Sequence, residues 1–234
     1  MKYISIIVLT VVLALSLSVC QSVKTEKEEP FTVKLDSPKI NLGTIEVQFD
    51  KMMGIAGIQQ ETVTIDYYPL EDAVCLQYRI NFMTYYLFFD REGRAAYFKA
   101  LEQYKEDYAN RVLKSSGNRN TRRKYGRVQT YLIWQAAAFM KRSMASMYTE
   151  IGYDIKSVSK NKASFFVLYQ REAEYVDKIT NKEIRNTQSL LIYLTRAKAD
   201  ELAELFNQEL LKSVVPETIK KKAEPLIVDT IDAY

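Results

Sequence analysis

Histidine is absent from this chain of 234 residues, and only two cysteines and seven glycines occur. Histidine is the commonest general base and the commonest nitrogen ligand of transition metals, so its absence excludes Ser-His-Asp triads, Cys-His dyads and HExxH zinc sites. The glycines are scattered, and the chain contains no GxSxG, P-loop or GxGxxG segment. We therefore expect no cofactor, no metal and no recognisable catalytic residue.

The two cysteines are Cys20, at the signal cleavage point that we predict below, and Cys75 in the domain; Cys20 is expected to be either cleaved off or acylated. An intrachain disulfide is therefore not expected in the mature protein, and stability must come from a hydrophobic core. Hydrophobic residues make up 47% of the chain and charged residues 26%, which is typical of a globular protein. The net charge of +4 is too small to indicate nucleic acid as a partner.

The first twenty residues have the layout of a secretory signal. Lys2 is followed by an uncharged, apolar or small-residue run from Ile4 to Val19. This run is short for a membrane-spanning helix, which needs about 20 residues. The sequence therefore predicts export, with residues 1–20 as the signal peptide.

The signal ends in Leu17-Ser18-Val19-Cys20. This segment resembles the lipobox of bacterial lipoproteins, in which the cysteine becomes the lipidated first residue of the mature chain. Leu17, Ser18 and Cys20 fit that pattern, and Val19 stands where Gly, Ala or Ser is usual and where the looser spirochaete-type motif is relaxed. The resemblance implies lipidation at Cys20 and a membrane anchor; ordinary cleavage, giving a periplasmic or secreted protein, is the alternative. It covers the signal alone and implies nothing about the domain that follows.

The rest of the chain divides into a tether, one domain and a tail. Residues 21–35 begin with QSVKTEKEEP, a charged stretch that cannot bury apolar area and suits a polar tether. Residues 36–215 carry the periodic hydrophobic patterns of a single domain. Residues 216–234, with three consecutive lysines from Lys220, predict a loosely ordered tail.

Period-two alternation predicts strands, and spacing of three or four predicts two helices. Expected strands cover 45–49, 63–67, 74–82 with a continuation to 89, 128–134, 149–155, 165–169 and 190–194. The helices follow Asp90 and Thr195, each a suitable N-cap, and extend to about residue 113 and to Pro216. Antiparallel meanders each followed by a covering helix indicate an α+β fold, with halves 36–116 and 126–215 as a candidate duplication of a strand-strand-strand-helix unit.

One charge cluster stands out between the two halves. It contains seven basic residues with no acid between them: Arg111, Lys114, Arg119, Arg122, Arg123, Lys124 and Arg127. One interpretation is a patch for anionic partners such as lipid headgroups, phosphorylated glycans or a polyanion. The other is a solvated loop that joins the halves.

Aromatic and acidic side chains give weaker candidates. Tyr85, Tyr86 and Trp134 could line a ligand groove, although aromatic residues in strands are usually packed in the core. Acidic pairs such as Asp90 with Glu92, or Glu71 with Asp72, could bind a hard cation or act as acid and base, although capping or a turn also explains them. We therefore expect an exported envelope protein that is a non-catalytic binding or structural module for an unknown protein or small molecule; an exported hydrolase that uses paired carboxylates is the alternative.

Overall fold

The computed structural model describes residues 31–50, 58–80, 82–113, 124–136, 142–158, 161–171, 174–176, 183–185, 189–217 and 219. The predicted signal peptide, Cys20 and the first part of the tether lie outside the described residues. Residues 114–123 of the basic segment and most of the tail also lie outside them.

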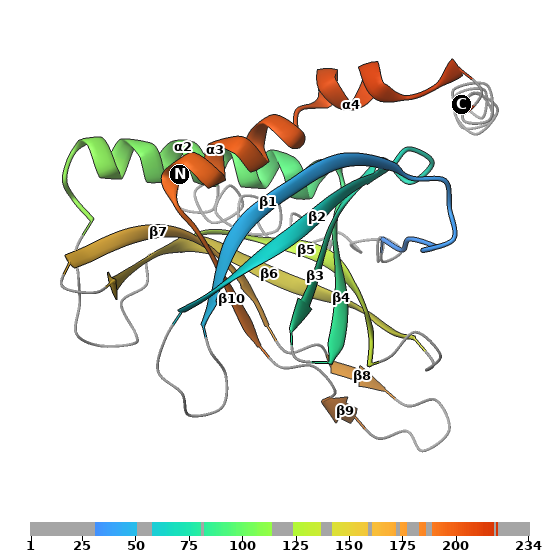
Figure 1. The fold of residues 1–234 in the computed structure, drawn as a ribbon, viewed down its shortest axis with the longest axis horizontal. Coiled ribbons are helices and arrows are strands. Elements are labelled where there is room, and N and C mark those ends of the chain that lie inside the picture. Colours follow the sequence, from blue (N-terminus) through green and yellow to red (C-terminus); the bar gives the residue numbers. More distant parts are fainter. Residues whose placement is uncertain are drawn as a thin grey trace, which may run out of the picture. The chain divides into compact units, whose positions relative to one another are not determined.

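Eight strands form a closed antiparallel barrel in the order β1-β10-β7-β6-β5-β4-β3-β2 (Figure 1). The barrel strands are β1 (Ile40–Asp50), β2 (Ile58–Tyr68), β3 (Ala73–Ile80), β4 (Met83–Phe89), β5 (Lys124–Gln135), β6 (Ser143–Val158), β7 (Asn161–Gln170) and β10 (Leu190–Leu194). The other elements are the hairpin β8 (Glu174–Val176) and β9 (Glu183–Arg185), and the helices α2 (Arg91–Ala109), α3 (Arg196–Leu205) and α4 (Gln208–Val214).

The predicted alternation of the early strands is confirmed. One side of each strand faces the interior of the barrel and is almost completely buried, as in Ile45, Val63 and Leu76, which are at most 1% exposed. Successive residues of a strand point to opposite faces, so an alternating sequence places every second side chain in one core.

The face expected from alternation is wrong at two places. Alternation puts Phe82 on the apolar side of the strand 74–82, but Phe82 lies in a turn and is 81% exposed. Alternation makes Phe165, Val167 and Tyr169 the apolar side of their strand, but the interior of β7 is lined by Phe166, Leu168 and Gln170.

The α+β prediction was wrong, because the sheet closes on itself instead of forming layers covered by helices. Closure depends on pairing between β1 and β10, in which Gln48 lies opposite Tyr193. Apolar alternation is the same whether a strand face packs against a helix or against the opposite wall of a barrel. The predicted duplication of two separate strand-strand-strand-helix units was also wrong, because all eight barrel strands belong to one closed sheet.

The helices α2 and α3 lie over one end of the barrel (Figure 1). Neighbouring strands alternate in direction, so β4 and β10 run the same way and deliver both helices to the same rim. Tyr97 and Tyr104 of α2 and Leu202 of α3 are fully buried in the same hydrophobic cluster as the barrel interior. The helices therefore close that end of the core.

Both predicted helix caps are confirmed. The Asp90 carboxylate accepts a hydrogen bond from the Gly93 amide at 2.7 Å, and the Thr195 hydroxyl accepts one from the Lys198 amide at 3.3 Å. The second predicted helix is interrupted: α3 ends at Leu205, and Asn207 caps the new helix α4. A side-chain oxygen at such a position satisfies amides that have no partner within the helix.

Residues 31–37 form a strap across the outer surface of the barrel. Val33 is 5% exposed and packs with Tyr131 and Ile133 of β5 and with Cys75 of β3 in a second hydrophobic cluster. Phe31 meets the Tyr131 ring edge-on at 6.3 Å between centroids. The last residues of the predicted tether, 31–35, thus contact the barrel wall.

Candidate functional site

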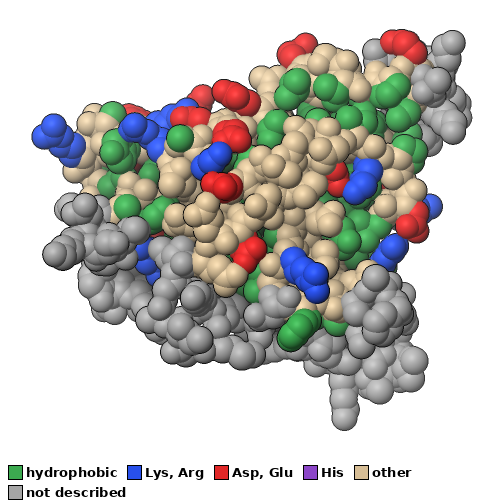
Figure 2. Space-filling view, in the orientation of Figure 1, with side chains coloured by type: hydrophobic (Ala, Val, Ile, Leu, Met, Phe, Trp, Pro, Cys, Tyr) green, Lys and Arg blue, Asp and Glu red, His purple; other side chains and the backbone are tan. Residues whose placement is uncertain are grey.

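A groove of about 1310 Å³ lies beside the helix-covered end of the barrel. Its walls come from the last turns of α2 and the residues that follow them, the start of α3, the hairpin between β6 and β7, and Gln48 of β1. Figure 2 shows lysine and arginine side chains, with acidic ones beside them, around the end of the helix layer where α2 terminates. Ligand sites usually combine apolar walls with a few polar groups.

Arg111 reaches the groove because of how α2 ends. The Val112 amide donates to the Asp107 carbonyl at 3.0 Å and the Arg111 amide donates to the Tyr108 carbonyl at 3.1 Å, which is the Schellman pattern of helix termination. This motif requires a left-handed residue after the cap, usually glycine, and Arg111 occupies that position with a φ of 55°. A charged side chain therefore stands where the backbone favours a residue without one.

Arg196, at the first position of α3, supplies a second guanidinium to the same groove. It lies over the ring of Tyr108 with 4.6 Å between the guanidinium carbon and the ring centroid. Tyr108 itself is 44% exposed, so the stacked pair faces solvent. Among the residues that the structure describes, no carboxylate forms an ion pair with Arg111 or Arg196.

The remaining charges of the groove neutralise each other. Lys105 of α2 forms an ion pair with Asp200 of α3, and Asp200 is the one carboxylate among the described lining residues. The first turn of α3 contains no acidic residue, whereas α2 and α4 carry Glu92 and Glu209 there. The groove consequently has an excess of positive charge.

The apolar floor of the groove includes Phe165 and Tyr104. Phe165 is 3% exposed, and the Tyr104 hydroxyl lies 3.0 Å from the Ser164 hydroxyl. Burial raises the pKa of Tyr104, so this phenol stays protonated at neutral pH. Above this buried layer, half-buried Ile155 and exposed Tyr108 line the groove, so it can offer an apolar surface and two guanidinium groups to one ligand.

The structure does not gather the described members of the basic segment into one patch. Arg111 lines the groove, Lys124 forms an ion pair with Glu150 at 2.8 Å, and Arg127 lies 3.6 Å from the ring centroid of Tyr148. Lys114, Arg119, Arg122 and Arg123 lie outside the described residues. Of the three described members, Arg111 alone lines the candidate site.

The aromatic candidates separate in a similar way. Tyr85 and Trp134 are register partners on the interior face of β4 and β5 and are at most 4% exposed. Tyr86 points outward and packs against the second cluster. These three side chains contribute to packing in two different places and do not line one groove.

Cys75 points out of the barrel yet is fully buried, because the strap covers it. Burial raises the pKa of its thiol well above the usual value, and the nearby Asp66 carboxylate raises it further. A nucleophilic cysteine needs a lowered pKa and access to substrate. Cys75 has neither.

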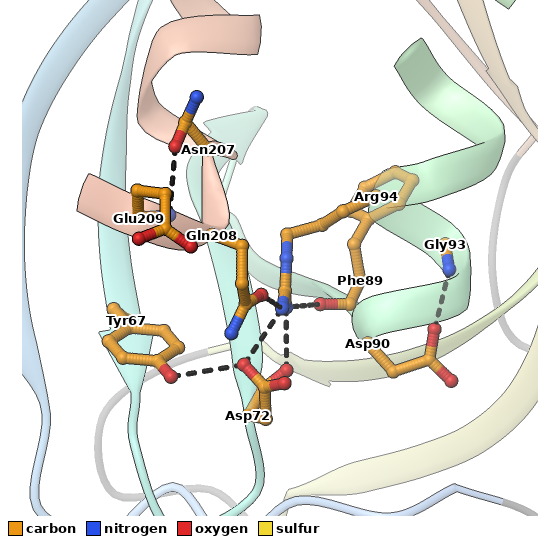
Figure 3. Close-up of polar contacts among 9 residues, drawn as sticks. All are labelled: Tyr67, Asp72, Phe89, Asp90, Gly93, Arg94, Asn207, Gln208 and Glu209. Carbon is orange, nitrogen blue, oxygen red and sulfur yellow. Dashed lines mark hydrogen bonds and ion pairs between the residues drawn. The ribbon is translucent and has the colours of Figure 1, made fainter. Parts of the chain in front are cut away.

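A buried arginine at the start of α2 is structural (Figure 3). Arg94 is 2% exposed, and its guanidinium donates to the Asp72 carboxylate at 2.7 Å, to the Asp72 carbonyl at 2.6 Å and to the Gln208 side chain at 2.8 Å. The Tyr67 hydroxyl donates to the same carboxylate at 3.0 Å. This network joins the turn between β2 and β3 to α2 and α4.

Three of the four acidic candidates have structural partners, and the fourth, Glu92, is exposed in the first turn of α2. Asp90 caps α2, Asp72 binds Arg94, and Glu71 accepts a hydrogen bond from Ser37. Within the described part of the chain, no group of three acidic, cysteine or histidine side chains could hold a metal ion. None of the described helices is long and apolar enough to cross a membrane.

Sequence reasoning missed Arg196 as a site residue, although it identified Thr195 as the cap before it. Arg111 and Arg196 are 85 positions apart and meet only because β4 and β10 deliver α2 and α3 to one rim. The one local signal was a basic residue in the first turn of a helix, where acidic residues are favoured.

Comparison with known proteins gives a family match that covers most of the chain. A family model described as an uncharacterised Treponema protein matches residues 24–213. No curated protein and no solved structure matches the chain.

Proposed function

This chain belongs to the family of uncharacterised Treponema proteins, and from that premise we propose that it is an exported envelope protein, anchored through Cys20, that binds a ligand without chemically changing it. The ligand lies in the groove beside α2 and α3. The spirochaete-type lipobox at Leu17 to Cys20 supports the anchor, since a Treponema protein comes from the group in which this relaxed motif occurs.

The observation that carries the binding proposal is the composition of the groove. Its volume of about 1310 Å³ can hold a small amphiphile, and its walls combine half-buried Ile155 with exposed Arg111, Arg196 and Tyr108. Exposed cationic side chains without described carboxylate partners contribute little to folding, so a role toward a ligand explains their position better than a role in stability.

The alternative, a hydrolase with paired carboxylates, has no support in this groove. Such an enzyme needs two carboxylates across a cleft, one to protonate and one to attack or activate water. Asp200 is the one carboxylate among the described lining residues, and Lys105 neutralises it. We therefore favour binding without catalysis.

Export and anchoring are tested by expressing the full chain with its signal in a bacterial host and measuring the intact mass of the mature protein. Diacyl or triacyl mass on Cys20 in the membrane fraction is the expected result. A mature chain that begins near residue 20 without lipid would support secretion without an anchor, and a cytosolic chain that retains Met1 would contradict export.

Binding is tested by native mass spectrometry of the protein after incubation with a bacterial envelope extract. We expect a bound small molecule that Ala163→Trp removes, because Ala163 lines the groove and the larger side chain fills it. Ala95→Trp, on an exposed position near the start of α2, is the matched control. If wild-type protein carries no molecule that Ala163→Trp displaces, the groove is not a binding site.

A further inference from the structure

We infer that the ligand of the groove is a phosphate-bearing amphiphile; this inference rests on the proposed function and adds the chemical class of the ligand. Two features of one groove point to this class. One is a pair of guanidinium groups without described carboxylate partners, and the other is the apolar floor beside them.

The negative charge of the ligand follows from the net positive charge of the described residues that line the groove. Lys105, Arg111 and Arg196 are cationic and Asp200 is anionic, and the pair between Lys105 and Asp200 leaves two guanidinium groups. An uncharged ligand would gain no charge-assisted hydrogen bond from the two guanidinium groups, whereas an anion would form such bonds with them. The positive end of α3 opens on the same groove and adds to the attraction.

Phosphate fits two guanidinium groups better than carboxylate does. A carboxylate has two oxygens, which a single arginine can occupy as a bidentate pair. Arg111 follows the end of α2 and Arg196 begins α3, so the two arginines approach the groove from different elements. A phosphate monoester has three terminal oxygens and can accept from both sides.

The apolar part of the ligand follows from what lies beside the arginines. Tyr108 is 44% exposed with Arg196 stacked on its ring, and the half-buried side chains of Ile155 and Leu113 also line the groove. A free phosphate ion would leave this surface in contact with water. An alkyl or aryl group attached to the phosphate would cover it and gain from burial.

The test compares three probes by titration calorimetry with the mature protein, each below any micelle-forming concentration. Dodecyl phosphate has both features, inorganic phosphate has the headgroup alone, and dodecyl maltoside has a similar tail with a neutral head. We expect dodecyl phosphate to bind about tenfold more tightly than either of the others, because dodecyl maltoside lacks the charged hydrogen bonds and inorganic phosphate lacks the alkyl group that covers the apolar wall. Added salt should weaken that binding, because the two guanidinium groups are exposed.

The charge requirement is tested with the double variant Arg111→Gln, Arg196→Gln. We expect an affinity for dodecyl phosphate about 100-fold lower, at tenfold for each lost charged contact. The matched control Arg91→Gln, Lys99→Gln removes the same charge from exposed positions of α2 outside the groove and should bind as wild type does.

The outcomes separate this inference from the proposed function. Equal binding of dodecyl maltoside and dodecyl phosphate, with no effect of the double variant, would overturn the phosphate requirement; if Ala163→Trp still blocked both probes, the groove would remain a binding site. Equal binding of inorganic phosphate and dodecyl phosphate would overturn the inference that the ligand carries an apolar group. Binding of every probe to Ala163→Trp would overturn the proposed function together with this inference.

Discussion

Two arginines at opposite ends of α2 show two uses of the same side chain. Arg94, in the first turn, is 2% exposed and donates to oxygens of Asp72 and Gln208. Arg111, just past the last turn, is exposed, has a left-handed backbone and forms no ion pair with any described carboxylate. The guanidinium of Arg94 is therefore hydrogen-bonded within the fold, whereas the guanidinium of Arg111 can bind a ligand.

The difference separates stability from function in this molecule. A buried guanidinium contributes only when its hydrogen bonds are satisfied, and Arg94 meets that condition with oxygens from three elements. Arg111 instead costs free energy, because a left-handed conformation is unfavourable for a residue with a side chain. Local costs of this kind are expected at functional sites.

The largest expected effect is that of Arg94→Met. Removal of the guanidinium leaves the Asp72 carbonyl and the Gln208 oxygen without their donor, whereas the Asp72 carboxylate is 36% exposed and stays partly hydrated, so the free energy of unfolding should fall by about 2–3 kcal/mol. Thermal denaturation followed by circular dichroism should show a midpoint about 5–10 °C lower. The control Arg91→Met, on an exposed position one turn earlier, should change little. A melting curve of Arg94→Met that overlays the wild type would break the comparison.

The next effect concerns a hydrogen bond across the barrel. Three strands lie between β3 and β7 in either direction around the barrel, and the Tyr78 hydroxyl of β3 donates to the Gln170 side chain of β7. Tyr78→Phe would leave a buried carbonyl oxygen without its donor and should lower the free energy of unfolding by about 1–3 kcal/mol, measured in urea.

The control for Tyr78→Phe is Tyr85→Phe. Tyr85 stacks on Tyr78 at 5.4 Å between centroids, and the change should cost much less because none of the described side chains hydrogen-bonds its hydroxyl. Adding Gln170→Leu to Tyr78→Phe should recover stability, since both polar partners are then gone. A double variant less stable than Tyr78→Phe would show that Gln170 has another essential partner.

The same comparison shows what could be predicted from the sequence. Helix caps at Asp90 and Thr195 are local chemistry, and both predictions were confirmed. The interior face of β7 could not be predicted, because Phe165 and Val167 are also buried, in an outer cluster, and the run has no polar side. Barrel closure could not be predicted either, since it depends on pairing between residues 145 positions apart, such as Gln48 and Tyr193.

The candidate site was predictable only in part, for the same reason. Arg111 belongs to a conspicuous basic segment, whereas Arg196 is an isolated arginine in a distant helix. The sequence therefore indicated a candidate anion-binding segment but did not indicate where the groove lies. Their common location is a consequence of strand direction around a closed barrel, which is a property of the whole fold.

A smaller effect on stability is expected at Glu150, which, like Asp72, forms ion pairs within the fold. Its carboxylate is 7% exposed and binds Lys124 and Arg171. Burial opposes ionisation, but the hydrogen bonds from both cations lower the pKa of Glu150 below the usual 4.5. A lowered pKa in the folded state adds stability that is complete above the unfolded pKa and is lost as the pH falls through the folded value.

Glu150→Gln should therefore lower stability by about 1 kcal/mol near pH 7 and flatten the loss of stability below pH 4.5. Urea denaturation at a series of pH values measures both. Glu209→Gln, an exposed residue whose side chain is 84% accessible, is the matched control and should leave the acid limb unchanged. An unchanged acid limb in Glu150→Gln would place the titration elsewhere.

The smallest effect on stability, and the sharpest contrast with Arg94, is expected for Arg111→Gly. Glycine adopts a φ of 55° without the steric cost of about 1–2 kcal/mol, while it loses about 0.5–1 kcal/mol in chain entropy, so the free energy of unfolding should stay equal or rise by about 0.5 kcal/mol. The same variant should bind dodecyl phosphate about tenfold more weakly. Urea denaturation and calorimetry on one preparation measure both quantities. A variant that is clearly destabilised and binds as tightly as wild type would reverse the assignment, because Arg111 would then serve the fold as Arg94 does.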